Sequence, residues 1–138
     1  ALAGSKELIK RARWARKLFG GGMRQAGIIA AGALYAMENK IERLAEDHAN
    51  AQVLARAIRQ SEGLTLQPDA VDTNILISHV EPSLGTASEF VDAMRVEGVL
   101  AMATAPQLIR LVTHLDVSAE QVAKACEVIK RVADSLAK

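Results

Sequence analysis

The segment Gly20 to Gly27 holds the residue types that most clearly suggest chemistry, because three consecutive glycines are followed by Met23, Arg24 and Gln25. Glycine lets the backbone approach a ligand closely. An arginine at the start of a helix adds a guanidinium to the free N–H groups of the first turn. The combination predicts a site for an anion, such as a phosphate or a carboxylate. The residues alone leave a tight packing turn between two helices as an equal alternative.

Arg110 is the second candidate. It lies in the run Leu108 to Thr113, where the alternation of a strand would place Leu108, Arg110 and Val112 on one face. A cation between two apolar neighbours either reaches water or needs an anion. The residues alone favour a structural ion pair or a side chain that extends to solvent. Capture of a carboxylate by the planar guanidinium is the functional alternative.

The histidines and the single cysteine give weaker signals. His48 lies on the apolar stripe of a predicted helix, His79 ends a predicted strand, and His114 precedes Asp116. Together with Cys126 they show no metal-ligand spacing, so no metal site is predicted. No nucleophile can be paired with a base from the sequence either.

Composition limits the classes of protein to which the chain can belong. Half of its 138 residues are hydrophobic and its net charge is +1, which argues against binding to nucleic acids or membranes. The longest apolar stretch, Ala26 to Met37, is shorter than the about 20 residues that a bilayer span needs. With one cysteine no internal disulfide can form, which predicts a cytoplasmic protein.

Three helices are predicted in the first part of the chain, at residues 5–18, 24–39 and 41–60. The first is basic and could attract nucleic acid, but it carries few aromatic residues, so a solvated or intersubunit face is the preferred interpretation. The second is dominated by small apolar residues. Its composition predicts burial on most sides, at a subunit interface.

Strands and helices are both predicted after Gly63. Strands are expected at residues 64–66, 74–80, 99–102 and 108–113. Two capping boxes, one at residues 86–89 and one at 118–121, each predict the start of a helix, and the first of these helices should end at Gly98. The chain therefore belongs to the α/β class, with a helical front part followed by a small mixed or antiparallel sheet covered by helices.

Three blocks of sequence carry a family resemblance. Their order and spacing resemble the low-specificity L-threonine aldolases, which are pyridoxal-phosphate (PLP) enzymes of fold type I, the aspartate-aminotransferase type. The blocks are Arg16 to Gly27, Arg43 to His48 and Arg110 to Val117. The resemblance extends over essentially the whole chain. It implies that the chain is only the C-terminal portion of such an enzyme, with residues 1–39 joining a PLP-binding domain and residues 40–138 forming the small domain.

The resemblance also implies an activity and two binding residues. The activity is retro-aldol cleavage of L-threonine or L-allo-threonine to glycine and acetaldehyde, with PLP as electron sink. Arg24 would bind the PLP phosphate of a neighbouring subunit, and Arg110 would bind the substrate carboxylate. The partners implied are the N-terminal portion of the enzyme and further copies in a homotetramer.

No catalytic residue is assigned within the chain. The family's Schiff-base lysine follows a serine in a Ser-Lys-Gly motif, which would fall before Ala1, upstream of a strand that Ala1 to Gly4 is expected to finish. Lys6 follows Ser5 but precedes Glu7 instead of glycine, so it is rejected as that lysine. The chain alone is therefore expected to be inactive. Two alternatives remain: another PLP lyase of the same fold, such as a β-eliminating lyase or a phenylserine aldolase, and a non-catalytic module that binds anions or nucleic acid.

Overall fold

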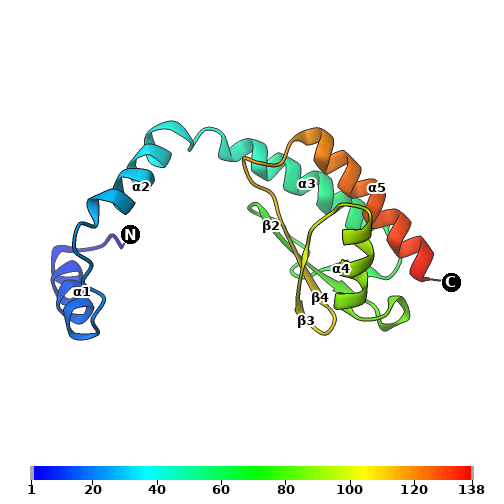
Figure 1. Cartoon of the computed structure of the whole chain (residues 1–138), viewed down its shortest axis with the longest axis horizontal. Coiled ribbons are helices and arrows are strands. Elements are labelled where there is room, and N and C mark those ends of the chain that lie inside the picture. The colour runs from blue at the N-terminus through cyan, green and yellow to red at the C-terminus, as the bar shows by residue number, and fades with distance from the viewer. Residues whose placement is uncertain (1, 138) are drawn as a thin grey trace. The chain divides into compact units, whose positions relative to one another are not determined.

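The computed structural model describes residues 2–137, which form two compact units (Figure 1). One unit ends at Ile41 and the other begins at Glu42. The first contains only helices, whereas the second combines a sheet with helices. None of the helices described within residues 2–137 is both long enough and apolar enough to cross a membrane.

The first helix of the first unit, α1 (Lys6–Leu18), has well-defined caps at both ends. Ser5 caps its start, because its Oγ accepts a hydrogen bond from the Leu8 N–H at 3.2 Å. At its end, the N–H groups of Gly20 and Gly21 donate to the carbonyls of Lys17 and Arg16, at 3.2 and 2.8 Å. This pair of bonds is a Schellman motif, and it requires the positive φ of 71° that Gly20 adopts.

Helix α2 (Gly27–Asn39) begins at Gly27 and not at the predicted Arg24. The chain turns at residues 24–26, where Gln25 has a φ of 50° that no α-helical residue adopts. Every residue of α2 is exposed, including Ile28 and Tyr35. Residues 2–137 supply no surface that covers its apolar sides, so burial of this helix at a subunit interface stays a prediction.

The second unit is built on a four-stranded sheet with the order β1-β2-β4-β3. All three strand pairs are antiparallel, so the sheet is antiparallel and not mixed. The elements in chain order are α3 (Leu44–Gln60), β1 (Leu64–Leu66), β2 (Ile75–Val80), the 3-10 turn η1 (Pro82–Leu84), α4 (Ala87–Val96), β3 (Met102–Ala105), β4 (Leu108–Val112) and α5 (Ala119–Leu136).

Both predicted capping boxes are confirmed. Thr86 and Glu89 exchange hydrogen bonds at the start of α4, and Ser118 and Gln121 do so at the start of α5. The prediction of a strand at residues 99–102 is wrong, because β3 begins only at Met102. The Val99 N–H donates to the Met94 carbonyl at 3.0 Å, so this residue closes the end of α4 instead.

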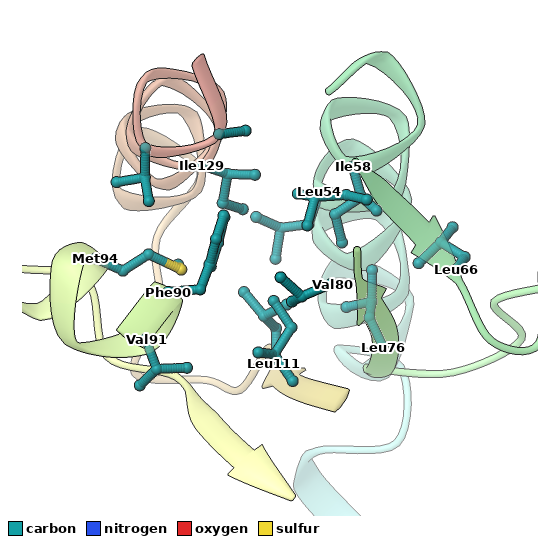
Figure 2. Packing of buried hydrophobic residues seen from close by; sticks show 14 of the residues in the cluster. Leu54, Ile58, Leu66, Leu76, Val80, Phe90, Val91, Met94, Leu111 and Ile129 are labelled. Carbon is teal, nitrogen blue, oxygen red and sulfur yellow. The ribbon is translucent and has the colours of Figure 1, made fainter. Parts of the chain in front are cut away.

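One face of the sheet carries the core of the second unit. Its buried residues pack against α3, α4 and α5, and Figure 2 shows Phe90 of α4 between Ile129 of α5 and the sheet residues Val80 and Leu111. Phe90 and Ile129 are fully buried. Burial of a large aromatic side chain at this junction of helix and sheet makes Phe90 a principal contributor to the stability of the unit.

The opposite face of the sheet remains exposed or half-buried, and we call it the open face. Its members alternate with the core residues along the strands, as a pleated strand requires. They are Thr65 of β1, Ile75, Ile77 and His79 of β2, Leu108, Arg110 and Val112 of β4, and Met102 of β3.

Candidate functional site

Arg110 lies at the middle of β4 on the open face, as the alternation of the sequence predicts. Its cross-strand neighbours are Ile77 on β2 and Met102 on β3, because both residues are in direct register with it. Directly paired residues project from the same face of a sheet. The guanidinium therefore lies among apolar side chains near the centre of this face.

The backbone of β4 is fixed at both ends. At its start, Gln107 Nε2 donates to the carbonyls of Val80 and Gly85, at 2.7 and 3.0 Å. At its end, Asn74 Nδ2 donates to the Thr113 carbonyl at 2.7 Å, and Thr113 Oγ1 donates to the Asp47 carbonyl at 2.7 Å. These side-chain bonds hold the strand that carries Arg110 against its neighbours, so the position of its Cα is set by the fold.

The guanidinium of Arg110 has no anionic partner among the described residues. Its Nη2 lies 3.5 Å from Met102 Sδ, and its Nε is buried without a hydrogen-bond partner. A buried donor that has lost water and gained no acceptor is costly, and native proteins rarely leave one. The structural ion pair that the sequence favoured is therefore absent from the described part of the chain. What the guanidinium lacks is an acceptor on the open face, and a carboxylate has the matching geometry.

Arg24 lies in the exposed turn between α1 and α2. Its guanidinium makes no ion pair with any residue in the range 2–137. The N–H groups of Gly20 and Gly21 are used to end α1, so these two groups are not free to bind an anion. The anion-binding prediction for this segment therefore rests on the side chain of Arg24.

Lys6 is the first residue of α1, next to the capping Ser5. Leu2 to Gly4 form no strand, contrary to expectation, because no described segment pairs with them. The position of Lys6 at the exposed start of a helix gives no reason to assign it a catalytic role.

The remaining polar candidates form no site. His48 is half-buried on α3, and His114 Nδ1 lies 3.2 Å from Asp116 Oδ2 in an exposed pair. Burial raises the pKa of the Cys126 thiol, which argues against a role as a nucleophile. Within residues 2–137, no three histidine, cysteine or acidic side chains come together in a way that could hold a metal ion.

Met102 is the neighbour of Arg110 that the sequence did not reveal. The two residues are eight positions apart, and their contact depends on how β3 pairs with β4. No local pattern encodes that register. The strand predicted at residues 99–102 would have placed Met102 at its end.

Comparison with known proteins assigns the chain to a family. The sequence pattern of the β-eliminating lyases matches residues 1–81, which is more than half of the chain. The chain belongs to the β-eliminating lyase family. The match includes the glycine segment with Arg24 and extends into the second unit as far as the end of β2.

Individual proteins also match most of the chain. The low-specificity L-threonine aldolase of Escherichia coli strain K12 is 43% identical over 125 residues, or 89% of this chain and 35% of that protein. A probable low-specificity L-threonine aldolase 2 of Arabidopsis thaliana is 40% identical over 119 residues, or 85% of this chain and 33% of that protein. The chain thus spans about a third of the length of these relatives.

The fold has counterparts among solved structures. The ornithine δ-aminotransferase of Plasmodium falciparum superposes on 69% of this chain with a TM-score of 0.55 and 15% identity, and the match covers 25% of that protein. At this level of identity the likeness concerns the fold alone. The α/β class predicted from the sequence is confirmed, and so is the resemblance to the threonine aldolases.

Proposed function

We propose that this chain is the C-terminal part of a PLP-dependent threonine aldolase, and that Arg110 binds the substrate carboxylate. The observation that carries the proposal is the guanidinium of Arg110, which is exposed at Nη2 on the open face and has no anionic partner among the described residues. A β-hydroxy-α-amino acid supplies the missing carboxylate. Its binding by a planar, bidentate guanidinium would fix the orientation of the Cα–Cβ bond.

The residues present fit PLP as the cofactor. Arg24 is an exposed cation without an anionic partner among the described residues, and it belongs to the segment that the family pattern covers. We assign it to the PLP phosphate of a neighbouring subunit. When bound, PLP supplies an electron sink for the charge that develops at Cα as the Cα–Cβ bond breaks. The chain's own contribution is to hold the phosphate at Arg24 and the substrate carboxylate at Arg110.

The proposal divides the work between two polypeptide portions. Residues 1–39 join the small domain, residues 40–138, to a PLP-binding domain in the two thirds of the relatives' length that this chain does not cover. The lysine that holds PLP belongs to that portion. We therefore expect the chain alone to be inactive and the full-length enzyme to act in the cytoplasm as a homotetramer, with α2 covered at an interface.

The decisive experiment is an assay of the full-length enzyme for cleavage of L-threonine and L-allo-threonine to glycine and acetaldehyde. The family description favours one alternative, β-elimination, which would release pyruvate and ammonia from substrates such as tryptophan. Elimination without aldol cleavage would refute the proposal. The isolated chain, mixed with PLP and reduced with borohydride, should show no cleavage and no adduct at Lys6.

The role of Arg24 has its own test. Arg24→Ala should weaken PLP retention by the full-length enzyme, because a charge-assisted contact worth about 1.5–3 kcal/mol is lost. Arg13→Ala removes an exposed arginine from α1 and serves as the matched control. Equal PLP affinity in the two variants would remove Arg24 from the cofactor site.

A further inference from the structure

We propose that Met102 is a positioning residue for Arg110. Its thioether holds the guanidinium against the open face of the sheet without neutralising its charge. The inference rests on the proposed role of Arg110 in binding the substrate carboxylate, and it adds a second residue to that site.

The contact follows from the register of the sheet. Met102 is the direct partner of Arg110 on β3, so the two side chains project from the same face, with Sδ 3.5 Å from Nη2. The register shifts between Ala103 and Ala105, immediately after this pair. A slip of β3 by one residue would turn Met102 to the other face. The irregularity adds one residue to β3 after Ala103, so β3 stays paired with β4 while Met102 remains opposite Arg110.

The chemistry of the thioether suits this position. Sulfur is a polarisable, weak acceptor. It can therefore orient one N–H of the guanidinium without competing strongly with a substrate carboxylate for the other N–H groups. A carboxylate at the same place would form an ion pair with Arg110 and displace the substrate. An aliphatic side chain would offer Nη2 no acceptor from the protein, and water alone would then solvate it. Methionine therefore fixes the direction of the guanidinium and leaves its charge and its other donors available to a carboxylate.

The contact can be measured in the full 138-residue chain, without cofactor or activity. In chain labelled with 15N-arginine, the Nε–H signal of Arg110, assigned by its loss in Arg110→Lys, should exchange slowly with water. Met102→Leu should speed that exchange by on the order of tenfold, because the guanidinium is no longer held in one position and its Nε–H reaches water more often. Met102→Gln should retain the protection, since its amide oxygen replaces sulfur as acceptor.

Two outcomes would overturn the inference. Unchanged exchange in Met102→Leu would show that the sulfur does not hold the guanidinium. Equal loss of protection in Met102→Leu and Met102→Gln would show that packing, and not an acceptor, determines the position of Arg110. Met102 is 52% exposed, so neither variant should disturb the core, and far-UV circular dichroism checks the fold of both.

Kinetic measurements on the full-length enzyme test whether the contact between Met102 and Arg110 affects substrate binding. Met102→Leu should raise KM for threonine about 3- to 10-fold and leave kcat within about twofold, because binding of the carboxylate is weakened in the ground state and the transition state alike. Met102→Glu should reduce kcat/KM on the order of 100-fold, because its carboxylate occupies Arg110. Val96→Glu adds the same charge at a site that is 88% exposed, and it should change neither constant.

The two measurements separate this inference from the proposed function. An enzyme without aldolase activity would refute the function, while the exchange experiment would still decide whether Met102 holds Arg110. An active enzyme in which Met102→Glu behaves like Val96→Glu would refute the positioning role and leave the function intact.

Discussion

Replacement of Arg110 by leucine should make the second unit more stable while it weakens substrate binding. The basis is the buried Nε of Arg110, which has no hydrogen-bond partner. Leucine is shorter than arginine, but it carries no hydrogen-bond donor, and its neighbours Ile77 and Met102 on the open face are also apolar. A residue kept for binding and not for folding should show this opposition between stability and function.

The magnitude can be derived from the state of the guanidinium. A buried donor without an acceptor costs about 1–3 kcal/mol, and the lower end applies because the rest of the side chain is only half-buried. Arg110→Leu should therefore raise the free energy of unfolding by about 1 kcal/mol. Loss of a charged hydrogen-bond pair with the carboxylate, worth about 1.5–3 kcal/mol, should reduce kcat/KM about 10- to 150-fold.

The stability assay must report on the second unit. Trp14 and Tyr35, the only tryptophan and tyrosine of the chain, both lie before Ile41, so intrinsic fluorescence reports on the first unit. Hydrogen exchange of peptides from β4, followed by mass spectrometry in increasing urea, measures the relevant transition.

Arg95→Leu is the matched control for this experiment. Arg95 forms an exposed ion pair with Asp92 at 2.9 Å, so its loss should change stability by less than about 1 kcal/mol. If Arg110→Leu destabilises the unit by more than Arg95→Leu does, Arg110 has a structural role, and the argument from its unpartnered Nε fails.

Two further predictions concern the stability of the second unit. Arg131 Nε donates to Glu97 Oε2 at 2.8 Å, and this hydrogen bond lowers the pKa of Glu97 below its ordinary 4.5. The stabilisation is therefore present above that pH and is lost as the pH falls, so Glu97→Gln should flatten the decline of Tm below about pH 5. Phe90→Ala should lower the free energy of unfolding by about 3–5 kcal/mol, because it removes a fully buried ring.

Both predictions have controls on the same unit. Glu62→Gln changes an exposed carboxylate that forms no ion pair with the described residues, and it should leave the decline of Tm unaltered. The same flattening in Glu62→Gln would remove the Glu97–Arg131 pair as its cause. Val96→Ala also truncates an apolar side chain of α4 to alanine, but at an exposed position. A loss of stability as large as that of Phe90→Ala would contradict the proposed packing.

Local signals predicted the helix starts of the second unit well. The capping boxes at Thr86 and Ser118 depend on groups three residues apart, so the sequence contains the whole interaction. The strand alternation that placed Arg110 on a face with Leu108 and Val112 is local in the same sense. These features needed no knowledge of the rest of the chain.

Features that depend on distant pairing could not be predicted. The apolar residues after Gly98 indicated a strand, but β3 starts at Met102, where pairing with β4 begins. The contact between Met102 and Arg110 depends on the same register, so no motif contained it. Burial of α2 was predicted from its composition, and it requires a surface that residues 2–137 do not supply.

Helix α2 determines how samples of these residues will behave. It presents Ile28, Ile29 and Leu34 to water, along with two glycines, Gly27 and Gly32, beside which a Cβ atom would meet nothing. A ridge of this kind attracts chaperones and promotes aggregation. We expect association through this ridge to increase with the concentration of the chain, so the exchange experiments should be run in dilute solution.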